Sequence, residues 1–113
     1  MKRIFSILAI ALTILVSLAF GQPAFAEVSA GAKIFNNNCA QCHKGGGNNV
    51  VAAKTLKADA LEKYSKNTVE AISLQVTKGK AAMPAFGKKL SADEISLVAN
   101  YVLEQSQNGW PKA

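Results

Sequence analysis

The 113-residue chain has few side chains that bind transition metals: one histidine, two cysteines and two methionines. A structural zinc site uses four cysteine or histidine ligands, so zinc would need a borrowed carboxylate or a second subunit here. Aromatic residues make up only 7% of the chain, and it contains no recognisable nucleic-acid-binding module. These shortages argue against a zinc-stabilised domain and against a nucleic-acid partner.

Three of these scarce side chains stand together in Cys39-Ala40-Gln41-Cys42-His43. Cys-x-x-Cys-His is the signature of covalent c-type haem attachment. Two cysteines one helical turn apart can each add to a vinyl group on one porphyrin edge, and the adjacent histidine is then the axial iron ligand. Zinc and a thioredoxin-like dithiol are the alternatives, although no βαβ pattern accompanies the pair.

The first 26 residues have the pattern of a secretory signal peptide. Lys2 and Arg3 precede an apolar run from Ile4 to Phe20, and Ala24-Phe25-Ala26 is a small-x-small cleavage site. We expect cleavage after Ala26, and an uncleaved membrane anchor is the alternative. Export suits the cysteine pair, because thioether bonds would occupy both thiols in an oxidising compartment.

The remaining residues, 27–113, form one small domain with a marginal core of its own. A chain of this size usually needs an additional stabilising group, such as disulfides, a metal or a cofactor. One covalently bound haem would supply a large apolar surface for the helices to pack against. Removing two basic residues with the leader leaves 13 − 2 = 11 against 7 acidic ones, a net charge of +4. This charge should attract the protein to acidic partner surfaces. We also expect a monomer, without stable membrane insertion once the leader is removed.

Helical periodicity and capping patterns predict an all-α domain of about four helices around the haem, without strands. The helices run from about Ser29 to the haem motif, from Thr55 to about Tyr64, from Asn67 to about Gly79, and from Ser91 to just before Asn108. Thr55 is expected to be the N-cap of the second helix, and Ser91 with Glu94 forms a capping box for the last.

Glycines mark two further places. Gly31 inside the first helix is costly unless another backbone approaches it closely. The run Gly45-Gly46-Gly47 is a loop, either a plain flexible connection or one whose backbone lies flat against the porphyrin. No strand precedes the run and no Gly-Lys-Ser/Thr closes it, so it is not a phosphate-binding loop.

Met83 is the only methionine left once Met1 is removed with the leader. Methionine is ordinarily a core gap-filler. Met83, however, precedes Pro84 in an extended segment and has no second histidine as competitor, so we predict that it is the other axial ligand. With both axial positions filled, the function is one-electron transfer; a haem enzyme or sensor with an open sixth site is the alternative.

Several separated motifs span nearly the whole chain after the leader: Ile34 to His43, Gly46 to Val51, Lys54-Thr55-Leu56, Gln75-Val76-Thr77, Ala82 to Gly87, and Trp110-Pro111. Together these motifs closely resemble the cytochrome c6 family, the soluble class I c-type cytochromes of cyanobacteria and algae.

The resemblance implies a class I cytochrome c fold whose terminal helices cross at Gly31 and Tyr101. It implies electron delivery from the cytochrome b6f complex to photosystem I in the thylakoid lumen, in parallel with plastocyanin. A carrier that serves respiration alone, delivering electrons to a terminal oxidase, is the alternative. The implied location is the lumen, with the periplasm as an alternative or additional compartment. Gln75 matches a family glutamine that tunes the haem potential, although from the sequence alone it is an ordinary exposed helix residue.

The chain departs from the family pattern at two places. Lys88-Lys89 stands where Gly-Arg is common, so Lys89 keeps the charge of the arginine but loses its planar fork. The segment from Val51 to Lys54 lacks a frequent proline. Lysines are the candidates for a charged ring around the docking surface: Lys33, Lys44, Lys80, Lys88 and Lys89.

Overall fold

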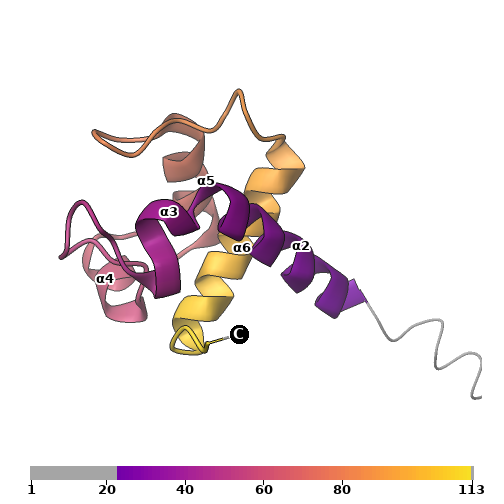
Figure 1. Ribbon diagram of the computed structural model, residues 1–113, viewed down its shortest axis with the longest axis horizontal. Coiled ribbons are helices and arrows are strands. Elements are labelled where there is room, and N and C mark those ends of the chain that lie inside the picture. The colour runs from indigo at the N-terminus through magenta and orange to yellow at the C-terminus, as the bar shows by residue number, and fades with distance from the viewer. Residues whose placement is uncertain (1–22, 113) are drawn as a thin grey trace, which may run out of the picture.

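The computed structural model describes residues 23–112, which form helices joined by loops (Figure 1). The helical elements are α2 (Pro23–Asn38), α3 (Ala40–His43), the 3-10 turn η1 (Lys44–Gly46), α4 (Ala58–Lys63), α5 (Val69–Lys78) and α6 (Ala92–Gln107). Across these residues the only β-type pairing is an isolated bridge between Lys80 and Met83. The predicted all-α class is confirmed.

The two longest helices, α2 and α6, cross each other, and the other elements lie around this crossing (Figure 1). Gly31 is buried at the crossing. A Cβ atom at Gly31 would come within 2.7 Å of both the Leu97 carbonyl oxygen and the Tyr101 Cβ. The predicted close approach is therefore confirmed: glycine lets the two helices meet at backbone distance.

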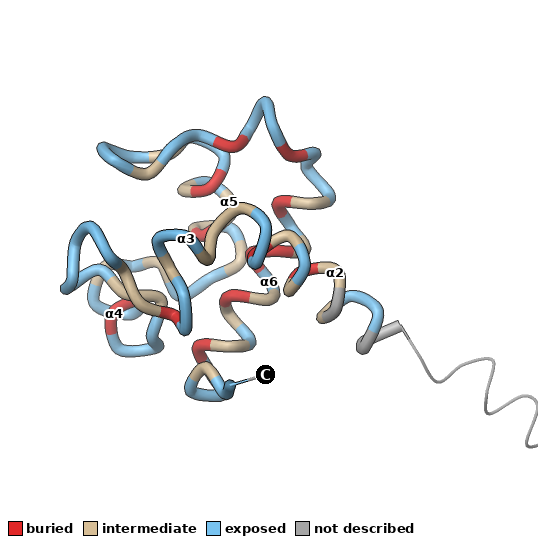
Figure 2. The backbone as a smooth tube through the Cα atoms, in the orientation of Figure 1, coloured by how far each residue is buried: buried red, intermediate tan, exposed pale blue. Residues whose placement is uncertain are grey.

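The hydrophobic core follows the inner face of α6 and extends to α2, α4 and α5 (Figure 2). Ala99 is fully buried and Val98 is 1% exposed. The other buried core residues are Phe35, Leu61, Ile72, Val76, Phe86, Leu90, Ile95 and Val102. Helices α5 and α6, both predicted from helical periodicity, supply most of these side chains, because residues three and four apart share one helix face.

Side-chain caps begin both of the last two long helices. Thr68 Oγ1 accepts a hydrogen bond from the Ala71 amide at 3.1 Å, at the start of α5. Ser91 Oγ accepts from the Glu94 amide at 3.1 Å, and Glu94 Oε1 accepts from the Ser91 amide at 3.0 Å. The capping box predicted for α6 is therefore confirmed.

Two predicted helix starts are wrong. Within the described residues the first helix already includes Pro23, rather than beginning near Ser29. The short helix α4 begins at Ala58, and its N-cap residue is Lys57, which makes no side-chain cap. Thr55 Oγ1 instead accepts from the Lys57 amide at 3.4 Å, so this hydroxyl stabilises a turn before the helix.

Most of the expected leader, including Lys2, Arg3 and the apolar run, lies outside the described residues. The expected cleavage site at Ala24–Ala26 falls in the first turn of α2. Between residues 23 and 112, no helix has the length and apolar character needed to cross a membrane.

Candidate haem site

The Cys-x-x-Cys-His motif begins at the end of α2 and forms the short helix α3. The Cys39 amide donates to the Phe35 carbonyl at 2.8 Å, and the His43 amide donates to the Cys39 carbonyl at 2.9 Å. Cys39 and Cys42 are not joined in a disulfide. Cys39 is partly buried against the hydrophobic core, whereas Cys42 is exposed. The two thiols therefore leave the same turn of helix, as attachment to one porphyrin edge requires.

A hydrogen bond to the backbone orients the imidazole of His43. Its Nδ1 lies 2.8 Å from the Gly47 carbonyl oxygen. A carbonyl can only accept, so Nδ1 carries the proton and Nε2 keeps its lone pair. This arrangement is typical of metal-binding histidines, because the second hydrogen bond selects the tautomer and raises the basicity of the ligating nitrogen.

The loop after the motif is held by two asparagines. Asn48 Oδ1 accepts from the amides of Val50 and Val51 at 2.9 and 2.8 Å, and its Nδ2 donates to the Lys54 carbonyl at 2.8 Å. Asn49 ties the loop to the motif, because its amide donates to the Cys42 carbonyl at 2.9 Å. These hydrogen bonds give the loop a defined conformation, and the expectation that its backbone lies flat against the porphyrin stays a prediction.

Met83 lies at the end of a tight four-residue turn. The amides and carbonyls of Lys80 and Met83 pair in both directions at 3.0 Å. The side chain of Met83 is partly buried and packs against the same hydrophobic cluster as Cys39. The turn presents the thioether from a backbone with fixed ends, which suits a ligand better than a flexible loop would.

Gln75 reaches Met83 from α5. Its Nε2 lies 3.9 Å from the Met83 sulfur, within the range of a hydrogen bond to sulfur. The Gln75 side chain is half-buried, so it is not the exposed helix residue that the sequence alone suggested. The structure thus brings together two of the predicted site residues from separate motifs.

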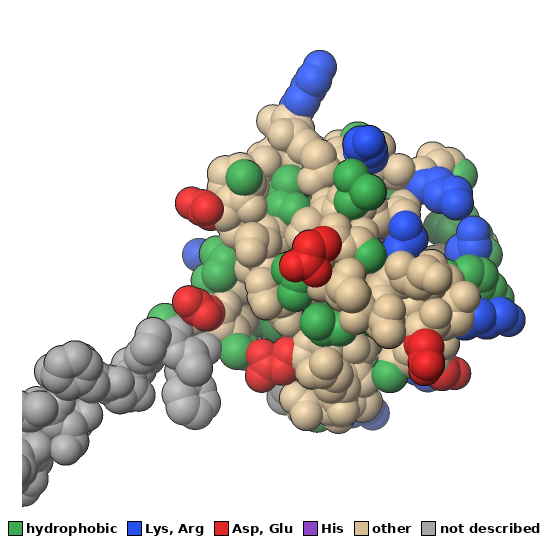
Figure 3. All heavy atoms as spheres, turned by 180° about the vertical axis from the view of Figure 1, so that it is seen from behind, with side chains coloured by type: hydrophobic (Ala, Val, Ile, Leu, Met, Phe, Trp, Pro, Cys, Tyr) green, Lys and Arg blue, Asp and Glu red, His purple; other side chains and the backbone are tan. Residues whose placement is uncertain are grey.

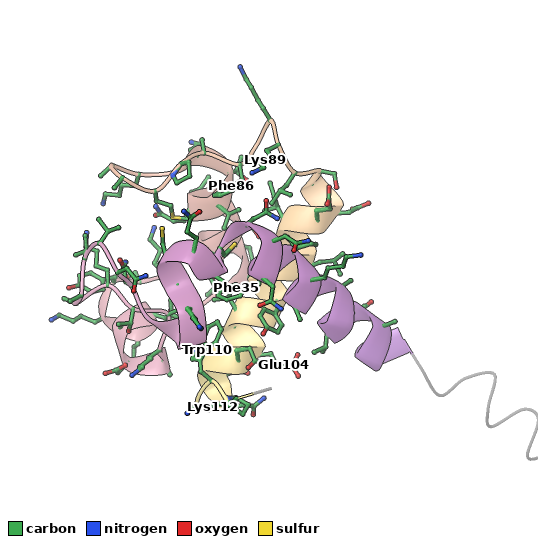
Figure 4. All side chains as sticks on the ribbon, in the orientation of Figure 1. Phe35, Phe86, Lys89, Glu104, Trp110 and Lys112 are labelled. Atoms are coloured by element: carbon green, nitrogen blue, oxygen red, sulfur yellow. The ribbon has the colours of Figure 1, made fainter. Side chains whose placement is uncertain are left out.

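Lys89, which departs from the family pattern, lies near Cys39 of the Cys-x-x-Cys-His motif. Burial, followed by the neighbouring Cys42, raises the pKa of the Cys39 thiol to about 11, and the charge of Lys89 acts in the opposite direction. Lys89 Nζ lies 5.7 Å from the centroid of the Phe86 ring, and Figure 4 shows these two side chains together beyond the end of α5. The charge of Lys89 therefore acts on the Cys39 thiol. The Lys89 side chain itself is exposed.

The residues present fit a haem c group. They offer two thiols on one helical turn, an imidazole with its Nε2 lone pair free, a thioether on a fixed turn, and apolar side chains beside them. In residues 23–112, no three His, Cys, Asp or Glu side chains come together as a metal-binding group. The zinc alternative gains no support from this arrangement.

Two contributors to the site were missed by reasoning from the sequence. The Gly47 carbonyl is a backbone atom, so no residue type announces it. Trp110 was recognised only as part of a motif, yet its indole packs beside the loop that carries Gly47. The excess of asparagine and glycine after His43 was the available signal, because these residues favour turns with defined geometry.

Replacing Gln75 with valine is expected to lower the midpoint potential by about 20–60 mV, the equivalent of one ordinary hydrogen bond. An N–H donated to the thioether withdraws electron density from the sulfur and so favours the reduced state. Potentiometric titration measures the effect. Leu74→Ala, on the exposed side of the same helix, is the control, and equal potentials in all three proteins would contradict the role of Gln75.

Comparison with known proteins gives consistent results. The family described as "Cytochrome C oxidase, cbb3-type, subunit III" matches residues 26–102. Cytochrome c6 of Aphanizomenon flos-aquae is 60% identical over 87 residues, which are 77% of this chain and all of that relative. Cytochrome c6 of a Synechococcus strain is 51% identical over 111 residues, covering 97% of this chain and 98% of the relative.

Solved structures agree with the sequence relatives. The structure of cytochrome c6 from the diatom Phaeodactylum tricornutum is 52% identical, covers 74% of this chain and 98% of its own, and superimposes with a TM-score of 0.72. Cytochrome c6C from Synechococcus sp. PCC 7002 is 51% identical, with a TM-score of 0.69 and coverage of 70% and 96%. Together with the site geometry, these similarities show that the chain belongs to the cytochrome c6 family of c-type cytochromes.

Proposed function

We propose that this protein carries single electrons from the cytochrome b6f complex to photosystem I. Membership of the cytochrome c6 family makes it an electron-transfer protein with one covalently bound haem c, and not an enzyme. The observation that carries the proposal is the 60% identity to a cytochrome c6 over that relative's whole length. The finer assignment to the photosynthetic chain follows from the resemblance at the motifs.

We assign the site residues by their chemistry. Cys39 and Cys42 would form the two thioether bonds, and His43 Nε2 and the Met83 sulfur would be the axial iron ligands. The haem supplies the redox change between Fe(III) and Fe(II). Gly47 keeps the proton of His43 on Nδ1, and Gln75 polarises the thioether. With both axial positions taken by the chain, neither dioxygen nor a substrate would reach the metal.

The surface near the motif suits transient docking. Val50 and Val51 are 59% and 45% exposed in the loop that follows His43. Seen from behind in Figure 3, many of the lysine side chains gather toward the side that carries α4, with hydrophobic side chains between them. The five lysines predicted for the docking ring are all exposed. Exposed apolar and basic side chains on one surface support fast, specific and short-lived encounters.

We expect the second-order rate of electron transfer to an acidic partner to fall as salt is added. The expected charge of +4 would attract such a partner over a Debye length of about 10 Å at 0.1 M ionic strength, and salt screens this attraction. Stopped-flow or flash kinetics at increasing ionic strength measure the rate. Lys88→Gln should flatten the dependence, whereas Lys112→Gln, beyond the end of α6, serves as the control. A wild-type rate independent of salt would remove the docking role of the lysines.

We place the mature protein in the thylakoid lumen after cleavage behind Ala26. The match to the Aphanizomenon protein spans 87 residues and all of that relative, and 113 − 26 = 87 residues remain after such a cut. The Synechococcus relative aligns over 111 residues, so its similarity extends into the leader. Both findings support a removable export signal.

Delivery to a respiratory terminal oxidase is the second candidate, and the description of the matching family as an oxidase subunit favours it. Deleting the gene and growing the strain with and without copper separates the two, because plastocyanin requires copper. The photosynthetic proposal predicts that phototrophic growth is lost only without copper and returns with the wild-type gene. Normal phototrophic growth without copper, with a loss of respiration in the dark, would instead support the oxidase.

A further inference from the structure

The segment after α6 folds back onto the molecule through Trp110. The Trp110 amide donates to the Gln105 carbonyl at 2.8 Å, and the residue has a positive φ of 54°. A bulky residue adopts this conformation only where its surroundings hold it there. In Figure 4 the Trp110 side chain lies beneath Phe35, near the end of α6.

The indole is held on several sides. Its ring centroid lies 5.2 Å from that of Phe35 and 6.1 Å from that of Tyr101. Its Nε1 donates to the Leu56 carbonyl at 2.8 Å, a bond between residues 54 positions apart. The Gly46 backbone lies directly against the ring, because a Cβ atom there would be 2.5 Å from three indole carbons.

Trp110, Leu56 and Gly46 are all in contact with one another, beside the backbone segment that hydrogen-bonds to His43. The Leu56 amide donates to the Gly46 carbonyl at 2.8 Å, so Leu56 is bonded to both Trp110 and Gly46. The next carbonyl, that of Gly47, accepts from His43 Nδ1. The indole therefore fixes the position of the peptide beside the acceptor, although it does not touch the imidazole.

The geometry points to Trp110 as a positioning residue for the axial ligand His43. By holding Gly46 and Leu56 in place, the indole keeps the Gly47 carbonyl where it accepts the Nδ1 proton, and so sets the basicity of Nε2. This inference rests on the proposed ligand role of His43. It assigns a redox function to a residue from the opposite end of the chain.

The test compares holo-protein variants by two measurements. NMR of the reduced protein gives the exchange rate of the His43 Nδ1 proton, and potentiometry gives the midpoint potential. Trp110→Ala should speed exchange by about three- to tenfold, as expected for a weakened hydrogen bond, and should raise the potential because a less basic imidazole stabilises Fe(III) less. Trp110→Phe keeps a ring but loses the hydrogen bond to Leu56. Its exchange rate and midpoint potential should lie between those of the wild type and of Trp110→Ala. Gly46→Ala perturbs the same contact from the other side, and it should act in the same direction.

Ile95→Ala, a core truncation near the start of α6 and thus at its other end, is the control for general loss of stability. It should lower the melting temperature and leave both exchange and potential unchanged. If the Trp110 variants behave like this control, Trp110 is only structural and the inference is wrong. If Trp110→Ala fails to fold, Trp110→Phe and Gly46→Ala still decide the question. Failure of the wild-type protein to show histidine ligation would instead overturn the proposed function, so the two failures are distinguishable.

Discussion

Replacing Met83 with alanine is expected to open the sixth coordination position of the haem. The far-red absorption band of a thioether bound to ferric iron should disappear, and the reduced variant should bind carbon monoxide. The midpoint potential should fall by on the order of 100 mV or more, because axial ligands alone vary haem potentials over about 0.8 V. Optical titration and potentiometry measure all three changes.

Met83→Leu separates the loss of the ligand from the loss of packing. Leucine keeps most of the volume against the core cluster, which Met83 contacts, but it lacks sulfur. If Met83 is the ligand, the leucine variant should match the alanine variant in spectrum and potential while retaining more stability. An unchanged spectrum in both variants would assign Met83 to the core alone.

A chain without haem is expected to lose cooperative folding. In residues 23–112 only α2 and α6 reach 16 residues, and α4 has six. Helices shorter than about 12–15 residues are marginal in water without tertiary packing. Cys39, Leu56, Val69 and Met83 pack against the core only partly buried, so the haem would complete the burial at this edge of the core.

The double variant Cys39→Ser and Cys42→Ser, produced without its leader, supplies the haem-free chain. Circular dichroism should show strongly reduced helix content and a broad, non-cooperative thermal transition. Leu74→Ala in the holo-protein, which changes only an exposed side chain, should melt like the wild type. A sharp melting transition of the haem-free variant would show that the polypeptide core is sufficient by itself.

The parts of the fold that could be predicted are those set by neighbouring residues. The capping box at Ser91 and the helical periodicity of α6 each depend on side chains within one or two helical turns. The wrong N-cap at Thr55 arose at a short helix, where a hydroxyl can stabilise the preceding turn as well as the helix. Local preference did not decide between these two arrangements.

The parts of the site that could not be predicted involve backbone groups or distant segments. The bond from His43 to Gly47 ends on a carbonyl, and the contact of Trp110 with Gly46 joins segments 64 positions apart. Gln75 and Met83 meet because α5 and the following turn pack together. The proposed ligand atoms could therefore be named from the sequence, whereas the groups that orient them could be identified only from the fold.

We propose that the chain fills both axial positions of its haem and therefore only exchanges electrons. The optical spectrum of the purified holo-protein, recorded oxidised, reduced, and reduced under carbon monoxide, tests this proposal. We expect a far-red thioether band in the oxidised protein and a reduced spectrum that carbon monoxide leaves unchanged. Absence of that band together with a carbon monoxide complex at neutral pH would show an open sixth site, and Met83 would then not be an axial ligand.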